Sequence, residues 1–438
     1  MKTKPRIPRG FRDFPPDIMI LRKYVINKIE NVFIKYGFDP IETPAIELWE
    51  VLSGKYGGEA EKLIWKFQDT YSGEWYGLRY DLTVPLARFV ALVQLPRPFK
   101  RYHIGRVWRH ERPQKGRYRE FWQADADIVG SPYPEADAEV ISLTIDAFLE
   151  LGFKNFILKL NDRRLLSGIF EEELKLAKYG EKTMLEIFRA IDKLDKIGIE
   201  GVENELRKIG LKDTEITKIR EIIAIHGKTE EILSQLLEKF GKNEKVKIAI
   251  DHIMQILDNV PRDLLKFIQF DLSLVRGLDY YTGPCWEVII PDVKIGSLSG
   301  GGRYDELIGI YTGEKIPATG TSLGVERIID AGLILEIFKL NRKTYTKVFI
   351  VTIDRKYRKY ANEIARILRM YGIPTQIDLM RRTWKKQVEY AKKKRIKVIA
   401  FIGEKESKTR TITIHIPDEN KHFDQIPIEK AIEIIKGI

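Results

Sequence analysis

The side chains best suited to chemistry lie between Phe99 and Gly130, in a stretch that reads as a strand, a polar loop and a second strand. Period-two alternation in the second strand places Gln123 and Asp127 on one face, two pleats apart. Charged groups crowd the neighbouring end of the loop: Arg109, Glu111, Arg112 and Arg117. An amide and a carboxylate beside several guanidinium groups suit a small zwitterion next to a polyphosphate, because arginine donates paired hydrogen bonds to phosphate. A solvated hairpin with surface ion pairs is the alternative for this stretch alone.

The order of the residues in this loop is more specific than its composition. Arg109 and Glu111, followed by a loop and then Arg117 and Phe121, form the pattern R-x-E and R-x-x-x-F. This pattern resembles motif 2 of the class II aminoacyl-tRNA synthetases. The run RHERPQKGRYREF is similar to the histidyl-tRNA synthetases in particular.

A second distinctive run, Leu274 to Gly283, reads LVRGLDYYTG. Arg276 precedes a glycine, so its side chain can enter a site without crowding, and Tyr280 and Tyr281 place two phenols beside Asp279. A phenol and a carboxylate can hold both nitrogens of an imidazole, one accepting and one donating a hydrogen bond. Two tyrosines packing a sheet are the alternative for the run alone. The run closely resembles a signature peculiar to the histidyl-tRNA synthetases.

Residues 76 to 94 read as a strand followed by a helix, with Asp81 and Thr83 where the strand ends. Asp81 could simply cap the helix, and Pro85 near the helix start agrees with that role. The segment LRYDLTVPLAR also resembles the archaeal and eukaryotic form of the family, in which the Asp and Thr hold the substrate α-amino group. Capping and ligand binding can coexist in one loop.

Three consecutive glycines, Gly300 to Gly302, permit positive φ and a close approach of the backbone to a ligand. A hairpin turn is the alternative. The run GGGRYDELI also matches the family, which would place Tyr304 near the substrate pocket.

A further run, from Gly320 to Arg327, has the pattern G-x-x-x-G-x-E-R between a predicted strand and a predicted helix. It resembles class II motif 3, whose arginine grips the ATP phosphates. The chain has no G-x-x-x-x-G-K-[ST] loop, so a P-loop kinase is excluded.

The elements around these motifs predict an α+β fold: a class II synthetase antiparallel-sheet catalytic domain with a helical insertion, plus a C-terminal α/β anticodon-binding domain. The helix at 21–37 and the following strand, interrupted by Pro44, resemble motif 1, which implies a homodimer. We expect the catalytic domain at 1–162 and 260–335 and the insertion at 163–259, where the pattern is almost wholly helical. Strand–helix alternation at 345–438 predicts a small α/β domain with a mainly parallel sheet.

The positive charge of the chain is concentrated at its C-terminal end. The net charge of the 438 residues is +12, but Asn341 to Ile438 hold 24 Lys+Arg and 11 Asp+Glu, a net charge of +13. A basic terminal domain on a neutral body suggests a docked polyanion. Lysine enrichment for solubility or thermal adaptation is the alternative.

The composition excludes several classes of protein. The 44% hydrophobic content is ordinary for a globular chain, and no run of about 18 apolar residues predicts a membrane span. The N-terminal stretch lacks an apolar signal segment, and the single cysteine, Cys285, excludes an internal disulfide framework and a cysteine-type zinc site. We therefore expect a cytoplasmic protein.

The resemblance implies a histidine–tRNA ligase whose partners are L-histidine, ATP and histidine tRNA. The catalytic residues that it implies are Arg276, Arg109 and Arg327. The implied histidine-binding residues are Asp81, Thr83, Gln123, Asp127, Arg276, Tyr280, Tyr281 and Tyr304. The implied ATP-binding residues are Arg109, Glu111, Arg117, Phe121 and Arg327, and the implied tRNA contacts are Arg112 and Gln114. Mg²⁺ is expected to accompany ATP, whose polyphosphate needs neutralisation, without a metal site built by the protein alone.

Three other functions are possible for such a chain. A synthetase-like regulatory protein would keep the fold but lose substrate residues or the anticodon domain, and both are present here. A class II synthetase for another amino acid conflicts with the run from Arg276 to Tyr281. A plain nucleic-acid-binding module would leave the acidic and phenolic side chains unexplained.

Overall fold

The computed structural model describes residues 4–55, 61–114, 116–225, 227–275 and 280–438. Contacts within the chain divide it into two compact units, which correspond chiefly to Val25–Phe338 and Lys339–Ile438. No helix within these described ranges is long and apolar enough to cross a membrane.

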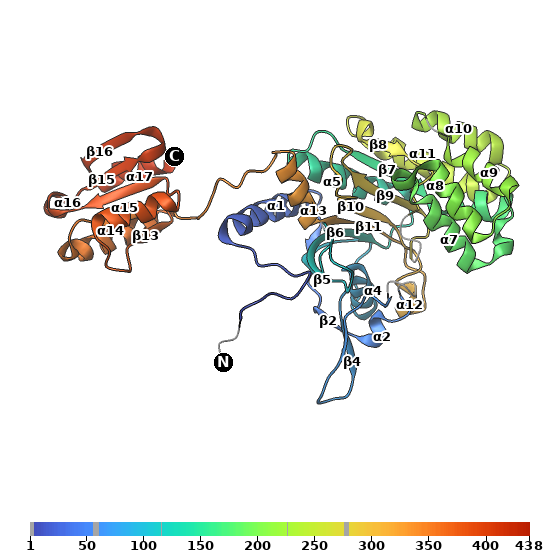
Figure 1. Ribbon diagram of the computed structural model, residues 1–438, viewed down its shortest axis with the longest axis horizontal. Coiled ribbons are helices and arrows are strands. Elements are labelled where there is room, and N and C mark those ends of the chain that lie inside the picture. The colour runs from blue at the N-terminus through green and yellow to red at the C-terminus, as the bar shows by residue number, and fades with distance from the viewer. Residues whose placement is uncertain (1–3, 56–60, 115, 226, 276–279) are drawn as a thin grey trace. The chain divides into compact units, whose positions relative to one another are not determined.

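A large sheet of eight strands lies at the centre of the first unit (Figure 1). In spatial order its strands are β1 (Asp39–Pro40), β5 (Phe99–Trp108), β6 (Glu120–Val129), β11 (Ala318–Gly324), β10 (Ser299–Arg303), β9 (Pro284–Ile289), β7 (Ile157–Asp162) and β8 (Ile268–Phe270). The six inner strands pair antiparallel, and the edge strands β1 and β8 pair parallel with their neighbours. This sheet confirms the antiparallel-sheet fold class expected from the sequence.

The hairpin of β5 and β6 begins and ends within one residue of the predicted positions. Its loop closes where Gln114 and Arg117 bond each other's backbone and Gly116 takes φ +75°, a left-handed conformation that glycine adopts without strain. Ala124, Ala126 and Ile128 lie on one face of β6, which α5 (Pro134–Glu150) covers. The polar side chains of β6 are therefore on the opposite face.

Several helices pack beside or against this sheet. α1 (Pro16–Lys35) buries Val25, Ile29, Val32 and Phe33. α13 (Val325–Ile334) follows β11 directly and contacts β6. A small antiparallel sheet of β2 (Ile46–Leu48), β4 (Trp75–Leu78) and β3 (Lys66–Gln68) accompanies α2 (Trp49–Leu52), α4 (Thr83–Leu92) and α12 (Gly309–Thr312).

The strand expected around Pro44 is interrupted, as its proline predicts. β1 ends at Pro40 in the large sheet, and β2 begins at Ile46 in the small sheet. Proline lacks the N–H that a continuous ladder requires.

The described residues between β7 and β8 form a helical subdomain (Figure 1, green). It consists of α6 (Arg163–Leu166), a π-helix (Ser167–Glu173), a 3₁₀ turn (Leu176–Tyr179), α7 (Glu181–Ile191), α8 (Leu194–Ile209), α9 (Asp213–Ile223), α10 (Thr229–Phe240) and α11 (Glu244–Asn259), with a 3₁₀ turn (Leu265–Phe267) before β8. Gly210 ends α8 in the left-handed conformation, as expected of a C-cap glycine.

The second unit contains a five-stranded sheet in the order β13 (Thr375–Ile377), β12 (Val348–Thr352), β14 (Val398–Ile402), β15 (Ile412–Ile416) and β16 (Lys421–Ile426). Its helices are α14 (Arg358–Met370), α15 (Trp384–Lys393), α16 (Glu404–Thr409) and α17 (Ile428–Gly437), with 3₁₀ turns at Arg355–Tyr357 and Pro417–Glu419. β13, β12 and β14 are parallel, but β15 and β16 are antiparallel. The prediction of a mainly parallel sheet is therefore wrong for the last two strands, because the short connection between them permits only a hairpin.

The glycine run also differs from its prediction. Gly300, Gly301 and Gly302 lie inside β10 rather than in a turn, and none of them has positive φ. The requirement for glycine is steric: a Cβ atom at Gly301 would overlap the indole of Trp286 and the carbonyl of Gly320. The run therefore allows close packing and close approach rather than an unusual backbone conformation.

Candidate active site

Strand register brings the polar side chains of the large sheet together. Asp127 of β6 lies between Arg101 of β5 and Gly320 of β11, and Asp125 lies between His103 and Ser322. Directly paired residues of neighbouring strands project to the same face. One face of three adjacent strands thus carries two carboxylates, a guanidinium group and an imidazole.

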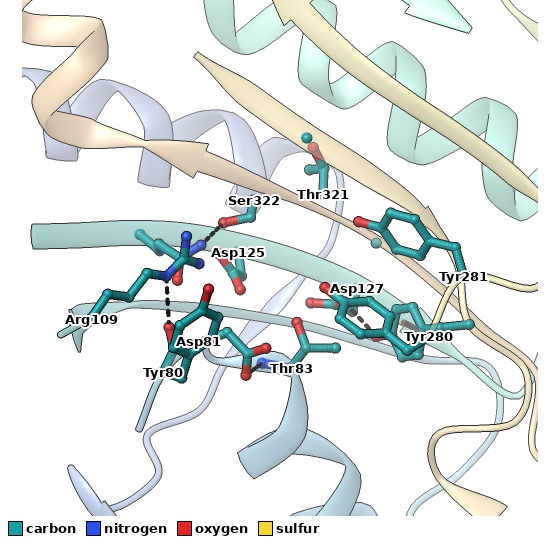
Figure 2. Close-up of a pocket in the computed structure, with 14 residues that line it drawn as sticks. Tyr80, Asp81, Thr83, Arg109, Asp125, Asp127, Tyr280, Tyr281, Thr321 and Ser322 are labelled. Carbon is teal, nitrogen blue, oxygen red and sulfur yellow. Dashed lines mark hydrogen bonds between the residues drawn. The ribbon is translucent and has the colours of Figure 1, made fainter. Parts of the chain in front are cut away.

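Glycines open a pocket on this face. Gly320 and Gly300 line it without side chains, and a Cβ atom at Gly320 would overlap Oδ1 of Asp127. The side chains around this inner pocket are Tyr80, Asp81, Thr83, Arg109, Gln123, Asp125, Asp127, Tyr280, Tyr281, Tyr304, Thr321 and Ser322. Asp125 and Ser322 lie toward its Arg109 end, and Asp127 lies toward Tyr280 and Tyr281 (Figure 2).

Asp81 caps the helix that follows it and also lines the inner pocket. Its Oδ1 accepts hydrogen bonds from the backbone N–H groups of Thr83, at 3.2 Å, and Val84, at 3.0 Å. These bonds satisfy the first donors of α4, as a helix cap does. The same carboxylate lines the pocket, so it can also face a cation.

Asp127 is buried at the opposite end. Arg101 lies 2.7 Å from its Oδ2, and the phenol of Tyr304 donates a hydrogen bond to its Oδ1. Burial raises the pKa of Asp127, while Arg101 and Tyr304 act in the opposite direction. Burial and the nearby Asp127 raise the pKa of Tyr304 well above its ordinary value, so that it remains a donor.

The two tyrosines of the LVRGLDYYTG run reach the same pocket. The rings of Tyr280 and Tyr281 pack edge to face with centroids 4.8 Å apart, and Tyr280 contacts the ring of Tyr304. Burial raises the pKa of Tyr280 well above its ordinary value. Arg276 and Asp279 lie outside the described residues.

A wider outer pocket adjoins the inner one. The charged and aromatic side chains that line it are Arg109, Glu111, Arg117, Tyr118, Phe121, Glu326 and Arg327. Gln123, Tyr280, Tyr281 and Ser322 line both pockets, as does Arg109. The two pockets therefore adjoin each other.

Two guanidinium groups in the outer pocket are held in place by neutral groups. Arg109 lies over the rings of Tyr80, at 4.2 Å, and Phe121, at 5.1 Å, and donates to the Tyr80 carbonyl. Arg327 donates to the carbonyls of Gly116, at 3.0 Å, and Ser297, at 2.8 Å. Guanidinium groups can donate paired hydrogen bonds to phosphate oxygens.

Most residues predicted for the site lie around these two pockets. Arg112 and Gln114 are exposed and line neither pocket. The sequence reasoning missed Tyr80, Arg101, Asp125 and Ser322. Asp125 carried a usable signal, because it shares a strand face with Gln123 and Asp127; Arg101 and Ser322 are placed by strand pairing, which the sequence does not state.

Comparisons with known proteins agree with this geometry. Residues 10–328 match the family model for histidyl-tRNA synthetase, and residues 347–438 match that for an anticodon binding domain. The chain belongs to the histidyl-tRNA synthetase family.

Its relatives match nearly the whole length of the chain. The histidine–tRNA ligase of Korarchaeum cryptofilum is 58% identical over 417 residues, or 95% of each protein. That of Aeropyrum pernix is 54% identical over 437 residues, or 99% of this chain and 98% of the relative. The crystal structure of histidyl-tRNA synthetase from Nostoc sp. PCC 7120 matches with a TM-score of 0.86 at 29% identity and covers 100% of both chains.

The second unit of this family member has a cavity of its own, at the carboxyl ends of β12 and β13. The residues around it are Thr352, Ile353, Arg355, Arg358, Asp378, Leu379, Arg381, Arg382 and Gln387. Arg382 pairs with the buried Asp378 at 3.0 Å, whereas Arg355, Arg358 and Arg381 make no ion pair with any described residue. Ligands of open α/β sheets bind at such strand ends.

Proposed function

We propose that the chain is a histidine–tRNA ligase, which activates histidine with ATP and transfers it to the 3′ end of histidine tRNA. The observation that carries this function is the pair of adjoining pockets. The inner pocket has acids and phenols suited to a zwitterion with an imidazole, and the outer pocket has two arginines suited to a polyphosphate. In the first step a histidine carboxylate oxygen attacks the α-phosphorus, and pyrophosphate leaves. In the second step the tRNA ribose hydroxyl attacks the carbonyl carbon, and AMP leaves.

Histidine recognition is assigned to the two ends of the inner pocket. Asp81, Thr83 and Gln123 would hold the α-ammonium group. Asp127 and Tyr281, with Tyr280 and Tyr304 beside them, would read the imidazole. Arg101 supports this role, because its charge at 2.7 Å favours the ionised form of Asp127, which accepts a hydrogen bond from an imidazole N–H.

ATP binding is assigned to the outer pocket. Phe121 would stack on adenine, while Arg109, Arg117 and Arg327 would hold phosphates and Glu111 would position Arg117, which lies 3.7 Å away. Arg276 would approach the histidine carboxylate and the α-phosphate. Catalysis of this kind depends on positioning and on stabilising charge at phosphorus rather than on covalent chemistry.

Mg²⁺ is proposed as the companion of ATP. Glu111 and Glu326 line the outer pocket and supply carboxylate oxygens, the ligand type that Mg²⁺ prefers. The described residues contain no cluster of three or more His, Cys, Asp or Glu side chains that could hold a metal. This donor set fits an ion held mainly by phosphates with one or two carboxylates. The ion would neutralise phosphate charge.

The tRNA is assigned to two parts of the chain. Arg112 and Gln114 on the exposed loop would meet the acceptor end, and the basic domain at 345–438 would bind the anticodon. We assign the catalytic domain to residues 1–162 and 260–335, and the helical insertion to residues 163–259. The unpaired arginines of the second-unit cavity support the anticodon assignment, because phosphate contacts supply most of the affinity for nucleic acid.

A homodimer in the cytoplasm is the proposed state of the enzyme. The small sheet exposes Ile46, Phe67 and Trp75, apolar side chains that a second copy would cover. The single cysteine suits a reducing compartment. Sedimentation velocity of the purified chain at micromolar concentration should show a dimer, and a monomer would exclude this assembly.

The test of the activity is ATP–pyrophosphate exchange by the purified chain with each amino acid in turn. We expect exchange with histidine and not with other amino acids, followed by charging of histidine tRNA. An Arg109→Gln variant removes a phosphate-binding charge and should lose exchange by at least about tenfold. Absence of exchange with every amino acid, from a folded sample, would indicate a regulatory protein with the synthetase fold.

A further inference from the structure

The loop that joins β5 to β6 supplies four side chains of the outer pocket: Arg109, Glu111, Arg117 and Tyr118. If the proposed function holds, this pocket takes ATP, and the positions of these side chains decide how well the phosphates are held. Loops are in general more mobile than the strands that they connect. Contacts that fix the loop from outside the pocket would therefore contribute to ATP binding.

A segment near the N-terminus, Pro8–Arg12, crosses this loop. The carbonyl of Gly10 accepts a hydrogen bond from the backbone N–H of Arg119 at 2.9 Å, and the carbonyl of Arg119 accepts one from the backbone N–H of Arg109 at 3.0 Å. Backbone hydrogen bonds thus join the N-terminal segment to the end of the loop, and the end of the loop to its beginning. The last of these bonds reaches a residue that lines both pockets.

Gly10 fits closely between the two limbs of the loop. It takes φ +90°, a left-handed conformation that glycine adopts without strain. A Cβ atom on Gly10 would lie 2.8 Å from Cγ of Arg119 on the returning limb and 2.9 Å from Cγ of Pro113 on the outgoing limb. A larger residue at this position would push the segment away from the loop.

The side chain of Arg119 makes a second connection between the segment and the loop. Its Nε donates a hydrogen bond to the carbonyl of Glu111 at 3.0 Å, and its Nη1 donates to the carbonyl of Arg9 at 3.5 Å. Gly10 and Arg119 are not among the described residues that line either pocket. Their influence on a ligand would therefore pass through the loop.

Two aromatic contacts extend the crossing to both ends of the loop. The guanidinium group of Arg12 lies over the ring of Tyr118, 3.4 Å from its centroid. The ring of Phe11 packs edge-on against Trp65 at 6.2 Å, and Trp65 packs against His110 at 4.5 Å. The N-terminal segment therefore contacts the end of the loop directly and its beginning through Trp65.

We propose that the N-terminal segment fixes the β5–β6 loop in the conformation that receives the phosphates of ATP, with Gly10, Arg12 and Arg119 as positioning residues. The contacts are made by backbone groups, aromatic rings and guanidinium groups, so they do not depend on pH in the working range. The inner pocket is lined mainly by residues of β6, β11 and α4 instead. Loss of the segment should therefore weaken the binding of ATP and not that of histidine.

The first test displaces the segment. Gly10→Ala should raise the KM for ATP in pyrophosphate exchange by about tenfold, and the KM for histidine should change by less than about twofold. Gly210→Ala is the matched control, because Gly210 has a similar φ of +99° but a Cβ atom there would have no described atom within 4 Å. The control should keep the wild-type constants. An unchanged KM for ATP in Gly10→Ala, or a KM for histidine that rises in step with it, would overturn the proposal.

The second test removes the contact with Tyr118. Arg12→Ala should raise the KM for ATP by about threefold or more, because the ring of Tyr118 loses the cation that packs on it. Arg6→Ala removes the same charge from an exposed position six residues earlier and should leave the KM unchanged. Equal effects of the two variants would mean that the N-terminal arginines attract ATP through their charge, which would also overturn the proposal.

Hydrogen–deuterium exchange measures the loop itself. In Gly10→Ala the amide hydrogens of Arg109 and Arg119 should exchange faster than in the wild-type chain, because the bonds that protect them are weakened. Amides of β6 should exchange at the wild-type rate, which shows that the sheet is intact. Unchanged protection of the loop would overturn the proposal. This comparison requires no activity, so a wild-type chain without histidine-dependent pyrophosphate exchange would refute the proposed function alone.

Discussion

His103 illustrates how the face that carries the site determines the charge of a single residue. It is 3% exposed, on the same face of β5 as Arg101. Burial first, and then the charges of Arg101 and Arg79, lower the pKa of His103 to about 3. The imidazole is therefore neutral in the folded chain at any pH at which the enzyme works. A proton there would add a third positive charge beside the two guanidinium groups.

This neutral imidazole predicts a loss of stability in acid. Between pH 6.5 and pH 3 the unfolded chain protonates this histidine and the folded chain does not, so the free energy of unfolding falls as pH falls. One such group contributes at most about 1.4 kcal/mol per pH unit. In the His103→Gln variant the free energy of unfolding should decrease less steeply as the pH falls. Urea denaturation of both proteins at about pH 7, 6, 5 and 4 measures this dependence. Parallel curves for the two proteins would show that His103 is protonated in the folded state.

The sequence predicts the site residues unevenly. Gln123 and Asp127 follow from strand alternation, and Tyr280 and Tyr281 from a distinctive run. Arg101 and Ser322 do not, because their contacts depend on which strands pair and in which register. Asp125 could have been found from its shared face with Gln123, but a carboxylate on a solvated strand has the same sequence pattern.

At the scale of elements, a buried charge cluster joins the helical subdomain to the sheet. Asp137 of α5 is fully buried and accepts hydrogen bonds from Arg303 of β10, at 2.7 Å, and from His252 of α11, at 2.8 Å. The Nδ1 of His252 lies 3.0 Å from Nη2 of Arg164. A guanidinium group only donates, so Nδ1 accepts and Nε2 carries the proton given to Asp137. Burial raises the pKa of Asp137, but the opposing effects of His252 and Arg303 are larger together, so the pKa lies below its ordinary value.

Removing the charge of Asp137 should be costly. Asp137→Asn would leave Arg303, which is 2% exposed, without its buried counter-ion, and we expect a loss of about 3 kcal/mol or more in the free energy of unfolding. Asp305→Asn is the matched control, because Asp305 pairs with the same arginine at 3.3 Å but is partly exposed, and it should cost about 1 kcal/mol or less. Chemical denaturation of both variants measures the difference. Equal losses would mean that Asp137 is not the principal partner of Arg303.

Elements were easier to predict than their pairing. The β5–β6 hairpin and α13 follow from local periodicity, glycine and proline. The glycine run was expected to permit positive φ, with a hairpin turn as the alternative, but it lies in β10 with no positive φ. Glycine is required at Gly301 because the indole of Trp286 on the next strand leaves no room for a Cβ atom. The antiparallel pairing of β15 and β16 likewise depends on the length of the loop between them, because a short loop permits a hairpin and a parallel crossover needs a longer connection.

At the scale of the whole molecule, charge is divided unequally along the chain. Asn341 to Ile438 carry a net charge of +13, and the other residues carry 51 Lys+Arg against 52 Asp+Glu. Some of the C-terminal charge is neutralised locally, as in the Arg382–Asp378 and Lys408–Glu404 pairs. Arg355, Arg358 and Arg381 gather instead around one cavity, an arrangement that supports the proposed docking site over general enrichment in basic residues.

Neutralising this cavity should weaken tRNA binding in a salt-dependent way. In the triple variant R355Q/R358Q/R381Q, binding of histidine tRNA should weaken. The slope of log K against log salt concentration should become shallower by about 0.7 to 0.9 for each phosphate whose charge the protein no longer neutralises. Filter binding at several salt concentrations measures the slope. Histidine-dependent pyrophosphate exchange should stay at the wild-type rate, because it needs no tRNA.

The control for this variant removes the same charge elsewhere in the C-terminal unit. Lys405, Lys430 and Lys436 are exposed and do not line the cavity, so their replacement by glutamine changes net charge equally. If the cavity docks the tRNA, the lysine variant keeps nearly the wild-type slope, because long-range attraction between exposed charges is screened beyond about 8 Å at physiological salt. An equal change of slope in both variants would mean that the domain attracts tRNA through its overall charge, and that the arginine cavity is not the place where the phosphates bind.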